Sequence, residues 1–384
     1  MADITPPPVK VFFPCTGLGR EMRGFEAFTR ECAAAVRDDD RIAVTVFGGG
    51  GAMESSERAI WNLPRAGRPA RALGALLRRD PYFIEQASFF AAFVPALLAG
   101  DPDVVYFADL NLGNACWHWR RASGQAFKLL YYNGGRTTRP FSRCDLVQQV
   151  SPEHLASALA RGERADHQVL LPHGVAIARA YRPVTREEQI AERHKLGVPA
   201  DGPLVLSVGA LEEAIKRMTY VIDEVAAMPV PAHLLLIGAT TRETAMVRAH
   251  ASSVLGARCT IRTLPRAEMP RAYRAADAFV LASLAEGFGI AQVEALDAGL
   301  PCVAHDTPTS AYILGEHGIR GDLRRPGALA PLLARALEMG GAGAAARHAY
   351  AHASFSWDVL APAYGSMFTA CAAGRRPDLD APRA

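Results

Sequence analysis

The feature that most constrains this chain is an apolar run, residues 278–282, that leads through a small polar loop into a helical pattern. The loop and helix read Ser283-Leu-Ala-Glu286-Gly-Phe-Gly289-Ile-Ala-Gln-Val-Glu294. Because glycine has no side chain, the two loop glycines let the backbone approach a ligand closely where the helix begins. The first amides of that helix and its positive dipole end favour negative charge. The pattern therefore predicts a buried strand of an α/β sheet followed by an anion site.

The same stretch carries two carboxylates. Glu286 lies in the loop and Glu294 follows eight positions later, about 12 Å along the axis if all the residues between them are helical. Carboxylates accept hydrogen bonds from hydroxyl groups, so their place beside an anion site predicts a ligand with both hydroxyls and phosphates, such as a nucleotide-sugar. The alternative is that Glu286 is an acidic residue at a helix start and that Glu294 is solvated.

The whole string carries a resemblance to a known family. Ser283-x-x-Glu286-Gly-Phe-Gly-Ile, then Glu294-Ala and Gly299-x-Pro-Cys-Val-Ala, resembles the donor signature of the retaining glycosyltransferases of family 4. The resemblance implies an α/β protein of the GT-B type, with two Rossmann-like domains that face each other across a deep cleft. It is strong over residues 204–304 and rests on the arrangement of elements alone before them.

The length of the chain agrees with two domains. It has 384 residues, half of them hydrophobic, which is enough for two separate cores. With the resemblance, residues 1–177 are predicted to form an N-terminal acceptor domain and residues 178–356 a C-terminal donor domain. A last helix at about 357–373 is expected to rejoin the first domain, and 374–384 to be a disordered tail.

The charge and the cysteine content indicate which partners and which cell compartment to expect. A net charge of +3 gives no reason to expect nucleic acid as a partner. The seven cysteines are odd in number and show no C-x-x-C spacing, which indicates reduced thiols in a cytoplasmic setting. No export signal precedes the first strand. The most apolar stretch, 87–99, is interrupted by Pro95 and is predicted to be a buried helix, too short to span a membrane.

The N-terminal strand, 9–13, leads through a glycine-containing loop into a helix, an order that suggests a dinucleotide site. However, Gly17, Gly19 and Gly24 are spaced two residues too widely for that fingerprint, and no acidic residue ends the second strand, 42–47. A nicotinamide site is therefore not favoured. By the resemblance, Gly17, Gly19 and Arg20 would face the donor phosphates and the acceptor, whereas the alternative is a tight turn with an exposed arginine.

An arginine-rich segment follows. Five arginines and no acidic residue lie between positions 65 and 79, on a stretch that can be helical from about Pro69. Such a segment can dock on an anionic membrane surface or bind a phosphorylated acceptor. Some members of the resembled family with lipid acceptors use their N-terminal domain in this way. A solvated helix face is the simpler interpretation.

Two further strands end in polar loops. Asp109 comes just after strand 103–107, at the carboxyl end, where open α/β sheets bind ligands. Many members of the resembled family have a histidine close to this position, so Asp109 is expected to hold an acceptor hydroxyl or amine, or else to form only a turn. Arg136, after strand 127–132, is a second candidate contact. His173 is interpreted as a turn residue and not as a base.

In the predicted donor domain the strand-loop-helix pattern begins again with strand 204–208, which is followed by Gly209. The resembled family has an arginine here and a lysine about five residues later, because the leaving diphosphate gains negative charge. Ala210 stands where the arginine would be, so Lys216 and Arg217 would supply the charge, or Arg20 or Arg136 would replace it. The alternative for Lys216 is an exposed lysine at a helix start.

The remaining roles also follow from the resemblance. Glu286 would hold hydroxyls of the donor sugar and Glu294 the ribose, with Phe288, Gly289 and Ile290 also in the donor site. The nucleotide base would lie near residues 262–265, contacted mainly through the backbone.

Glu286, Lys216 and Asp109 are the predicted catalytic residues, and no protein nucleophile is named. No Asp-x-Asp or His/Cys cluster stands near the donor loop, so we expect a metal-independent reaction without a cofactor. The co-substrate would be a UDP- or GDP-linked sugar, and the acceptor a small molecule, glycan or lipid. The alternative is a GT-B protein that binds a nucleotide-sugar without transferring it. An oxidoreductase is the least favoured class.

Overall fold

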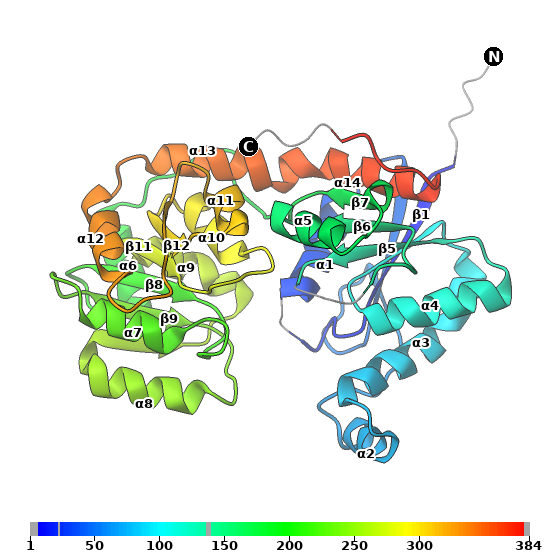
Figure 1. Cartoon of the computed structure of the whole chain (residues 1–384), viewed down its shortest axis with the longest axis horizontal. Coiled ribbons are helices and arrows are strands. Elements are labelled where there is room, and N and C mark those ends of the chain that lie inside the picture. The colour runs from blue at the N-terminus through cyan, green and yellow to red at the C-terminus, as the bar shows by residue number, and fades with distance from the viewer. Residues whose placement is uncertain (1–6, 22–23, 136–139, 380–384) are drawn as a thin grey trace. The chain divides into compact units, whose positions relative to one another are not determined.

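The computed structural model describes residues 7–21, 24–135 and 140–379. The chain forms two compact units, each built on its own parallel sheet (Figure 1). Unit 1 comprises Met1–Ala176 together with Trp357–Arg383, and unit 2 comprises Ile177–Ser356. The prediction placed the boundaries at 177/178 and 356/357. Each unit is described by itself below.

The sheet of unit 1 has the strand order β3-β2-β1-β4-β5-β6-β7, and all of its pairs are parallel. Its strands are almost continuously apolar, which is typical of parallel strands covered on both faces. They are β1 (Val9–Cys15), β2 (Ile42–Gly48), β3 (Glu57–Ala59), β4 (Val104–Phe107), β5 (Lys128–Asn133), β6 (Leu146–Gln149) and β7 (Gln168–Leu170).

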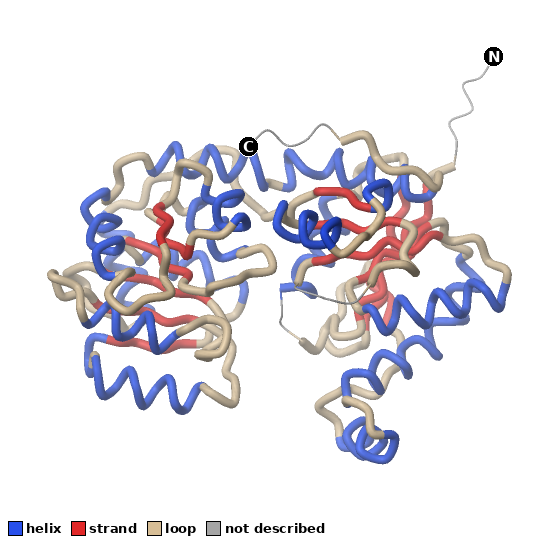
Figure 2. Tube along the Cα trace, viewed as in Figure 1, coloured by secondary structure: helices blue, strands red, loops and turns tan. Residues whose placement is uncertain are grey.

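Helices flank this sheet (Figure 2). They are α1 (Gly24–Ala35), α2 (Arg68–Leu77), α3 (Pro81–Gly100), α4 (Leu110–Ser123), α5 (Pro152–Ala160), the 3-10 turn η1 (Ala165–His167) and α14 (Trp357–Ala372). The last helix belongs to unit 1 because the buried Tyr364 hydroxyl donates to the Pro172 carbonyl at 2.8 Å. Beyond α14, the Arg375 amide donates to the Ala370 carbonyl, and residues 380–384 of the predicted tail lie outside the described residues.

Helix α3 is longer than its sequence suggested. It begins after Asp80, whose carboxylate accepts from the Tyr82 amide at 2.7 Å, and it continues through Pro95 to Gly100. With 20 residues it is the one described helix whose length and composition would allow it to cross a membrane, so the expectation that this stretch was too short was wrong. Phe89, Phe93 and Leu97 on its buried face pack in the core of unit 1, as a core helix does.

Unit 2 repeats the architecture with the strand order β10-β9-β8-β11-β12-β13, again parallel throughout. Its strands are β8 (Leu204–Val208), β9 (His233–Ile237), β10 (Cys259–Arg262), β11 (Ala278–Leu281), β12 (Cys302–His305) and β13 (Ile319–Gly321). Its helices are α6 (Arg186–Leu196), α7 (Met218–Ala226), α8 (Thr244–Val254), η2 (Gly256–Arg258), η3 (Arg266–Glu268), α9 (Met269–Ala275), α10 (Ile290–Asp297), α11 (Pro308–Leu314), α12 (Ala330–Met339) and α13 (Ala344–Phe355).

Both sheets reverse their strand order once. In unit 1 the reversal lies between the neighbouring strands β1 and β4, and in unit 2 between β8 and β11. At such a switch point the two following loops diverge and leave a crevice at the carboxyl ends of the strands, where doubly wound proteins bind ligands. The fold thus predicts where each unit binds its ligand. The two Rossmann-like units expected from the sequence are present.

Candidate functional site

The centre of the candidate site in unit 2 is an ion pair between Lys216 and Glu286. Lys216 lies in the loop after β8 and Glu286 in the loop after β11, so the pair forms at the switch point of this sheet. The Lys216 ammonium donates to Oε1 of Glu286, and the two side chains are only 19% and 16% exposed. Neither residue is a solvated charge at a helix start, and the fold brings these two predicted residues together.

Two glycines make room for the lysine. A Cβ on Gly209 would lie 2.9 Å from Cδ of Lys216, so the lysine stem lies directly over this backbone. A Cβ on Gly238 would lie 1.6 Å from the Gly209 carbonyl oxygen, which no relaxation of a side chain could relieve. Gly238 is therefore required for the close packing of the loop that begins at Gly209, and a side chain at Gly209 would displace the Lys216 stem.

The loop that carries Lys216 is fixed by two acidic residues that the sequence analysis missed. Glu243 accepts hydrogen bonds from the Glu213 amide at 2.8 Å and the Ala214 amide at 3.2 Å, and these bonds lower its pKa. The Glu213 carboxylate in turn accepts from the Thr219 amide at 2.8 Å, at the start of α7. Neither glutamate belongs to a motif, so nothing in the sequence distinguished them from surface acids.

Arg217 has a different position from Lys216. Its backbone is left-handed, with φ 52°, and its guanidinium donates to the Leu323 carbonyl at 2.7 Å and the Ala282 carbonyl at 3.4 Å. The same group lies 3.9 Å from the ring centroid of Tyr220. These contacts hold three chain segments together behind the site. Because the Arg217 guanidinium is engaged by these carbonyls and Ala210 carries no charge, Lys216 is the better placed of the two predicted cations to contact a phosphate.

The residues around the start of α10 lie where the pattern put them. Gly289 has φ +96° and precedes Ile290, the first residue of α10, so a glycine is needed at this turn. Phe288 is buried with its ring edge-on to that of Phe355. Among the described residues the buried Ser283 hydroxyl has no hydrogen-bond partner. Buried polar groups are rarely left unsatisfied, so this hydroxyl is a candidate ligand contact.

Glu294 is held by two residues that the sequence did not single out. Its Oε2 accepts from the Tyr273 hydroxyl at 2.6 Å, and its Oε1 forms an ion pair with Arg266. Burial and the neighbouring Glu294 carboxylate raise the pKa of Tyr273 well above its usual range, so the phenol keeps its proton and donates. Glu294 is therefore an oriented acceptor and not the solvated residue of the alternative interpretation.

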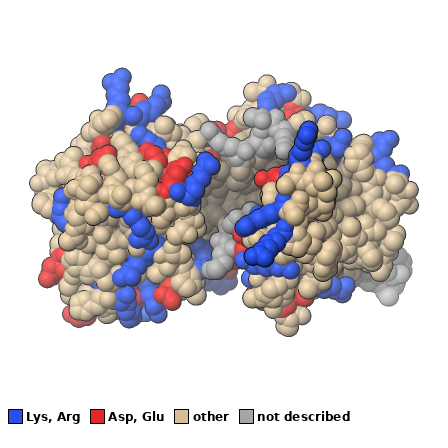
Figure 3. Space-filling model, turned by 90° about the horizontal axis from the view of Figure 1, so that it is seen from below, with Lys and Arg blue, Asp and Glu red and all other residues tan. Residues whose placement is uncertain are grey.

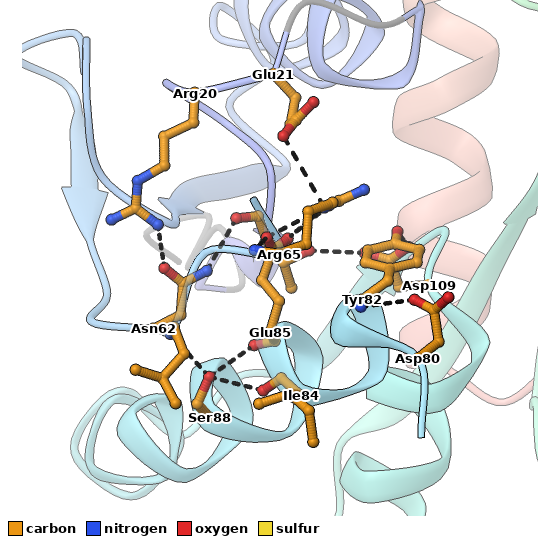
Figure 4. A network of polar contacts seen from close by, with 12 residues as sticks. Arg20, Glu21, Asn62, Arg65, Asp80, Tyr82, Ile84, Glu85, Ser88 and Asp109 are labelled. Carbon is orange, nitrogen blue, oxygen red and sulfur yellow. Dashed lines mark hydrogen bonds and ion pairs between the residues drawn. The ribbon is translucent and has the colours of Figure 1, made fainter. Parts of the chain in front are cut away.

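Unit 1 has its own polar cluster at the switch point, drawn in Figure 4. Asp109, after β4, accepts from the Tyr82 hydroxyl and from the Thr16 hydroxyl at 3.2 Å, and Thr16 follows β1. Asp109 precedes α4, but its side chain does not cap that helix. The residue is thus more than a turn former. Tyr82, on the first turn of α3, was missed because its partner is 27 positions away.

The glycine loop after β1 packs against a second glycine loop. Gly19 has φ +86°, its carbonyl accepts from the Ala52 amide at 2.9 Å, and a Cβ on it would lie 2.5 Å from the Gly50 carbonyl. The Gly17 carbonyl accepts from the Arg20 amide at 3.0 Å, which closes a tight turn. Contacts within the protein thus explain why position 19 is a glycine, whereas the bond to the Gly17 carbonyl does not require one, and the role of both toward a ligand stays a prediction.

Arg65 and Glu85 complete the cluster of unit 1. The Arg65 guanidinium pairs with the buried Glu85 carboxylate at 2.5 Å and lies 3.7 Å from the Tyr82 ring centroid. Arg20 is exposed and donates to Oδ1 of Asn62 (Figure 4). Arg136, proposed from the sequence as a further contact, lies outside the described residues.

His173 lies in the aromatic core of unit 1. Its Nδ1 is 2.8 Å from the Tyr132 hydroxyl, and its ring packs on Phe28 with centroids 4.5 Å apart. A Cβ on the next residue, Gly174, would meet the Trp357 ring at 2.5 Å. The surroundings are those of a packed turn, which agrees with the interpretation preferred from the sequence.

All seven cysteines are free thiols, and six are buried. Within the described part of the chain no three His, Cys, Asp or Glu residues lie close enough together to hold a metal ion. A metal-independent reaction stays a prediction.

Two doubly wound units, each with charged side chains at its switch point, define a GT-B protein. Solved structures agree: HepE from Anabaena, solved with UDP and glucose, has a TM-score of 0.72 at 20% identity and covers 94% of this chain and 99% of its own. Sucrose-phosphate synthase from Thermosynechococcus elongatus has a TM-score of 0.73 at 20% identity, covering 94% and 98%. At such identities the likeness concerns the fold, and the predicted fold class is confirmed.

The model of the family described as glycosyl transferases group 1 matches residues 202–339 of this chain. The chain is 29% identical over 212 residues to a D-inositol 3-phosphate glycosyltransferase from Acidothermus cellulolyticus, covering 51% of this chain and 46% of the relative. A protein of the same name from Xylanimonas cellulosilytica is 30% identical over 227 residues, covering 56% and 54%. The chain thus spans about half the length of these relatives. The family resemblance found in the sequence is confirmed.

Proposed function

We propose that this chain transfers a sugar from a UDP- or GDP-linked donor to a hydroxyl or amine acceptor, with retention of anomeric configuration and without a metal ion. The observation that carries the proposal is the Lys216–Glu286 ion pair at the switch point of unit 2. The ammonium can bind a phosphate, and the carboxylate can accept from sugar hydroxyls. Both side chains are mostly buried and lie in the loops at the carboxyl ends of the strands, where such a fold binds its ligand.

Lys216 would stabilise the leaving group. When the glycosidic bond breaks, the nucleoside diphosphate gains negative charge, and preorganised donors at that point lower the barrier. An ammonium group has three donors, so the bond to Glu286 leaves two for phosphate oxygens. The first amides of α10, which begins at Ile290, add partial positive charge on the same side of the sheet.

The carboxylates would position the sugar parts. Glu286 would accept from donor-sugar hydroxyls, and Glu294 from the ribose, with Tyr273 and Arg266 fixing its orientation. In unit 1, Asp109 would accept from the acceptor hydroxyl or amine, oriented by Tyr82 and Thr16. Carboxylates already held by one partner lose less freedom on binding, which favours affinity.

The comparisons suggest which substrates to test first. HepE was solved with UDP and glucose and also with UDP-glucose, so we propose UDP-glucose as the first donor, with a GDP-linked sugar beside it. The two sequence relatives are named for D-inositol 3-phosphate, which makes an inositol phosphate one acceptor to include. Acceptor classes then extend to glycans and lipids.

The experiment measures nucleotide release together with the anomeric form of the product. Wild-type protein should release nucleoside diphosphate only when donor and acceptor are both present. Glu286→Gln should lose turnover while its unfolding temperature stays near that of the wild type. Glu338→Gln, on the exposed face of α12, is the matched control and should keep full activity. Full activity of Glu286→Gln would refute the assignment.

A second candidate is a GT-B protein that binds a nucleotide-sugar without transferring it. It is favoured by Ala210 in place of an arginine and by the engagement of Arg217 with backbone carbonyls, which leave Lys216 as the predicted clamp. Titration calorimetry with UDP and GDP distinguishes the two candidates when combined with product detection. Tight binding with no product from any donor and acceptor pair would favour the second.

We also propose a reducing, cytoplasmic setting for the chain, because its seven cysteines are unpaired and mostly buried. A fusion to a reporter that is active only in the cytoplasm would test this. Activity of the chain that depends on disulfide formation would contradict it.

A further inference from the structure

Helix α2 is the part of unit 1 that the proposed reaction does not use. It lies beyond α3 at the rim of the unit (Figure 1) and buries only Ala70 and Gly74. Gly74 lets α2 approach the next segment closely, because a Cβ there would lie 2.7 Å from the Arg79 carbonyl. The helix is therefore attached along a narrow strip of small residues, and the rest of its surface is open.

The open surface contains the large apolar side chains of α2. Leu76 is 78% exposed, Leu77 53% and Leu73 36%. These positions follow the three- and four-residue spacing that places side chains on one helix face. In a helix of a water-soluble protein the leucine face normally packs against the core. Here the small residues face the protein and the leucines face outward.

Arginines flank the leucines. No acidic residue occurs between Arg58 and Asp80. Arg68, Arg71 and Arg79 are exposed, and in the part of the chain that the structure describes none of these three is paired with a carboxylate. Figure 3 views the molecule from the side on which α2 lies and shows basic side chains projecting from unit 1 among uncharged ones.

We propose that α2 docks on an anionic lipid bilayer. Its exposed leucines would enter the boundary between headgroups and acyl chains, and its arginines would contact the acidic headgroups, as in interfacial amphipathic helices. An acidic protein surface would satisfy the arginines but would not need three leucines turned to solvent on one short helix. The combination favours a membrane. The docking is independent of the proposed transfer reaction.

The residues on either side of α2 are anchored to the body of unit 1. Arg65, just ahead of α2, is fixed by Glu85 and by the Tyr82 ring, while Asp80, just after α2, caps α3 (Figure 4). A docked α2 would thus orient unit 1 on the bilayer. Tyr82, on the first turn of α3, also contacts Asp109, so the segment that follows α2 leads directly to the predicted acceptor residue, and this last link alone rests on the proposed function.

The test is sedimentation of the full chain with vesicles, at low and high salt. Vesicles of phosphatidylcholine and phosphatidylglycerol in equal parts are compared with vesicles of phosphatidylcholine alone. Two variants remove one component each: L76S/L77S and R68Q/R71Q. The matched control is R242Q/M246S/R248Q, which changes exposed basic and apolar side chains on or next to α8 in unit 2.

Wild type and the α8 control should sediment with the anionic vesicles and not with the neutral ones. The R68Q/R71Q variant should bind about 30-fold more weakly, and its remaining binding should depend less on salt. The L76S/L77S variant should lose at least about tenfold. Unfolding temperatures near that of the wild type would show that the variants fold.

Three results would overturn the proposal. The first is equal sedimentation of the wild type and both α2 variants with the anionic vesicles, and the second is no sedimentation of the wild type. The third is a wild-type dimer in vesicle-free buffer that L76S/L77S dissociates, since the leucine face would then bind a second copy of the chain. None of these results depends on whether the protein transfers a sugar.

Discussion

Lys216 and Glu286 form a largely buried ion pair although 70 positions separate them in the chain. They meet because β8 and β11 are neighbours at the point where the strand order of unit 2 reverses. Two loops that leave adjacent strands in opposite directions bring a cation and a carboxylate to one place. The fold therefore explains why residues so far apart act on one ligand.

The ammonium of Lys216 is expected to contribute mainly to the transition state. Lys216→Met should lower kcat by about 10²–10³-fold, as loss of one stabilising donor does elsewhere. The donor KM should change less, because the charge on the leaving diphosphate grows as the bond breaks. Initial rates of nucleotide release over a range of donor concentrations measure both. A Lys216→Met enzyme with a higher KM and an unchanged kcat would show that the lysine only binds the ground state.

Tyr273 is expected to stabilise unit 2 through Glu294. Tyr273→Phe removes a hydrogen bond to a carboxylate, which should lower the free energy of unfolding by about 1.5–3 kcal/mol. Tyr350→Phe is the matched control, because that hydroxyl donates to the neutral Tyr312 carbonyl at 3.0 Å and should cost only about 1 kcal/mol. Denaturant unfolding measures both. Equal losses would mean that the charge of Glu294 adds nothing to the bond.

The sequence predicted the strands best where they are continuous apolar runs. The predicted range 204–208 coincides with β8, and the predicted range 42–47 lies within β2. The strands β3 and β13 were missed because each has three residues, two of them charged in β3 and one in β13, and a run that short has no readable period. These short strands form because a neighbouring strand pairs with them. Val46 of β2 is in register with Glu57 of β3, and Val303 of β12 is in register with Ile319 of β13.

The residues of the candidate site also fall into two groups, those that the sequence predicted and those that it did not. Lys216 and Glu286 could be found because each belongs to a local stretch that resembles a part of the family pattern, Glu286 in the donor signature and Lys216 in the loop after strand 204–208. Tyr273, Glu243 and Tyr82 could not, because each acts on a residue that the fold and not the sequence places beside it. Residues that orient a site are in general harder to predict than those that belong to its motif.

Tyr82 is expected to control the acceptor step and not the donor step. Tyr82→Phe removes the phenol that donates to Asp109 and should raise the acceptor KM by about tenfold, equivalent to about 1.4 kcal/mol. The donor KM should stay unchanged, because Tyr82 orients Asp109, which is assigned to the acceptor. Steady-state rates with each substrate varied in turn check this. An equal rise in both constants would indicate a general structural role.

The hydrogen bonds to the Glu243 carboxylate should make the free energy of unfolding depend on pH. Amides of Glu213 and Ala214 lower the pKa of Glu243 below the ordinary value of 4.5, so the folded state favours the ionised form. This stabilisation is present above pH 4.5 and is lost as the pH falls through the lowered pKa. Glu243→Gln should therefore unfold more readily than wild type at pH 7 and equally at strongly acidic pH. Denaturant unfolding at both pH values tests it, and a pH-independent difference would contradict it.

Arg193 and Arg186 on α6 offer a contrast between a buried and an exposed ion pair. Arg193 is fully buried, pairs with Asp277 at 2.7 Å and also donates to the Gly202 carbonyl at 2.9 Å. Arg186 pairs with the exposed Asp201 at 2.9 Å. Removing one partner of a buried pair leaves the other charge without compensation, whereas a surface pair contributes little.

Arg193→Met should therefore lower the free energy of unfolding by about 3 kcal/mol, the lower end of the range for buried pairs, because the Asp277 side chain is 30% exposed and partly solvated. Arg186→Met should cost at most about 1 kcal/mol. Denaturant unfolding of the two variants at neutral pH gives both values on one helix. A loss for Arg193→Met no larger than that for Arg186→Met would mean that solvation of Asp277 replaces the guanidinium.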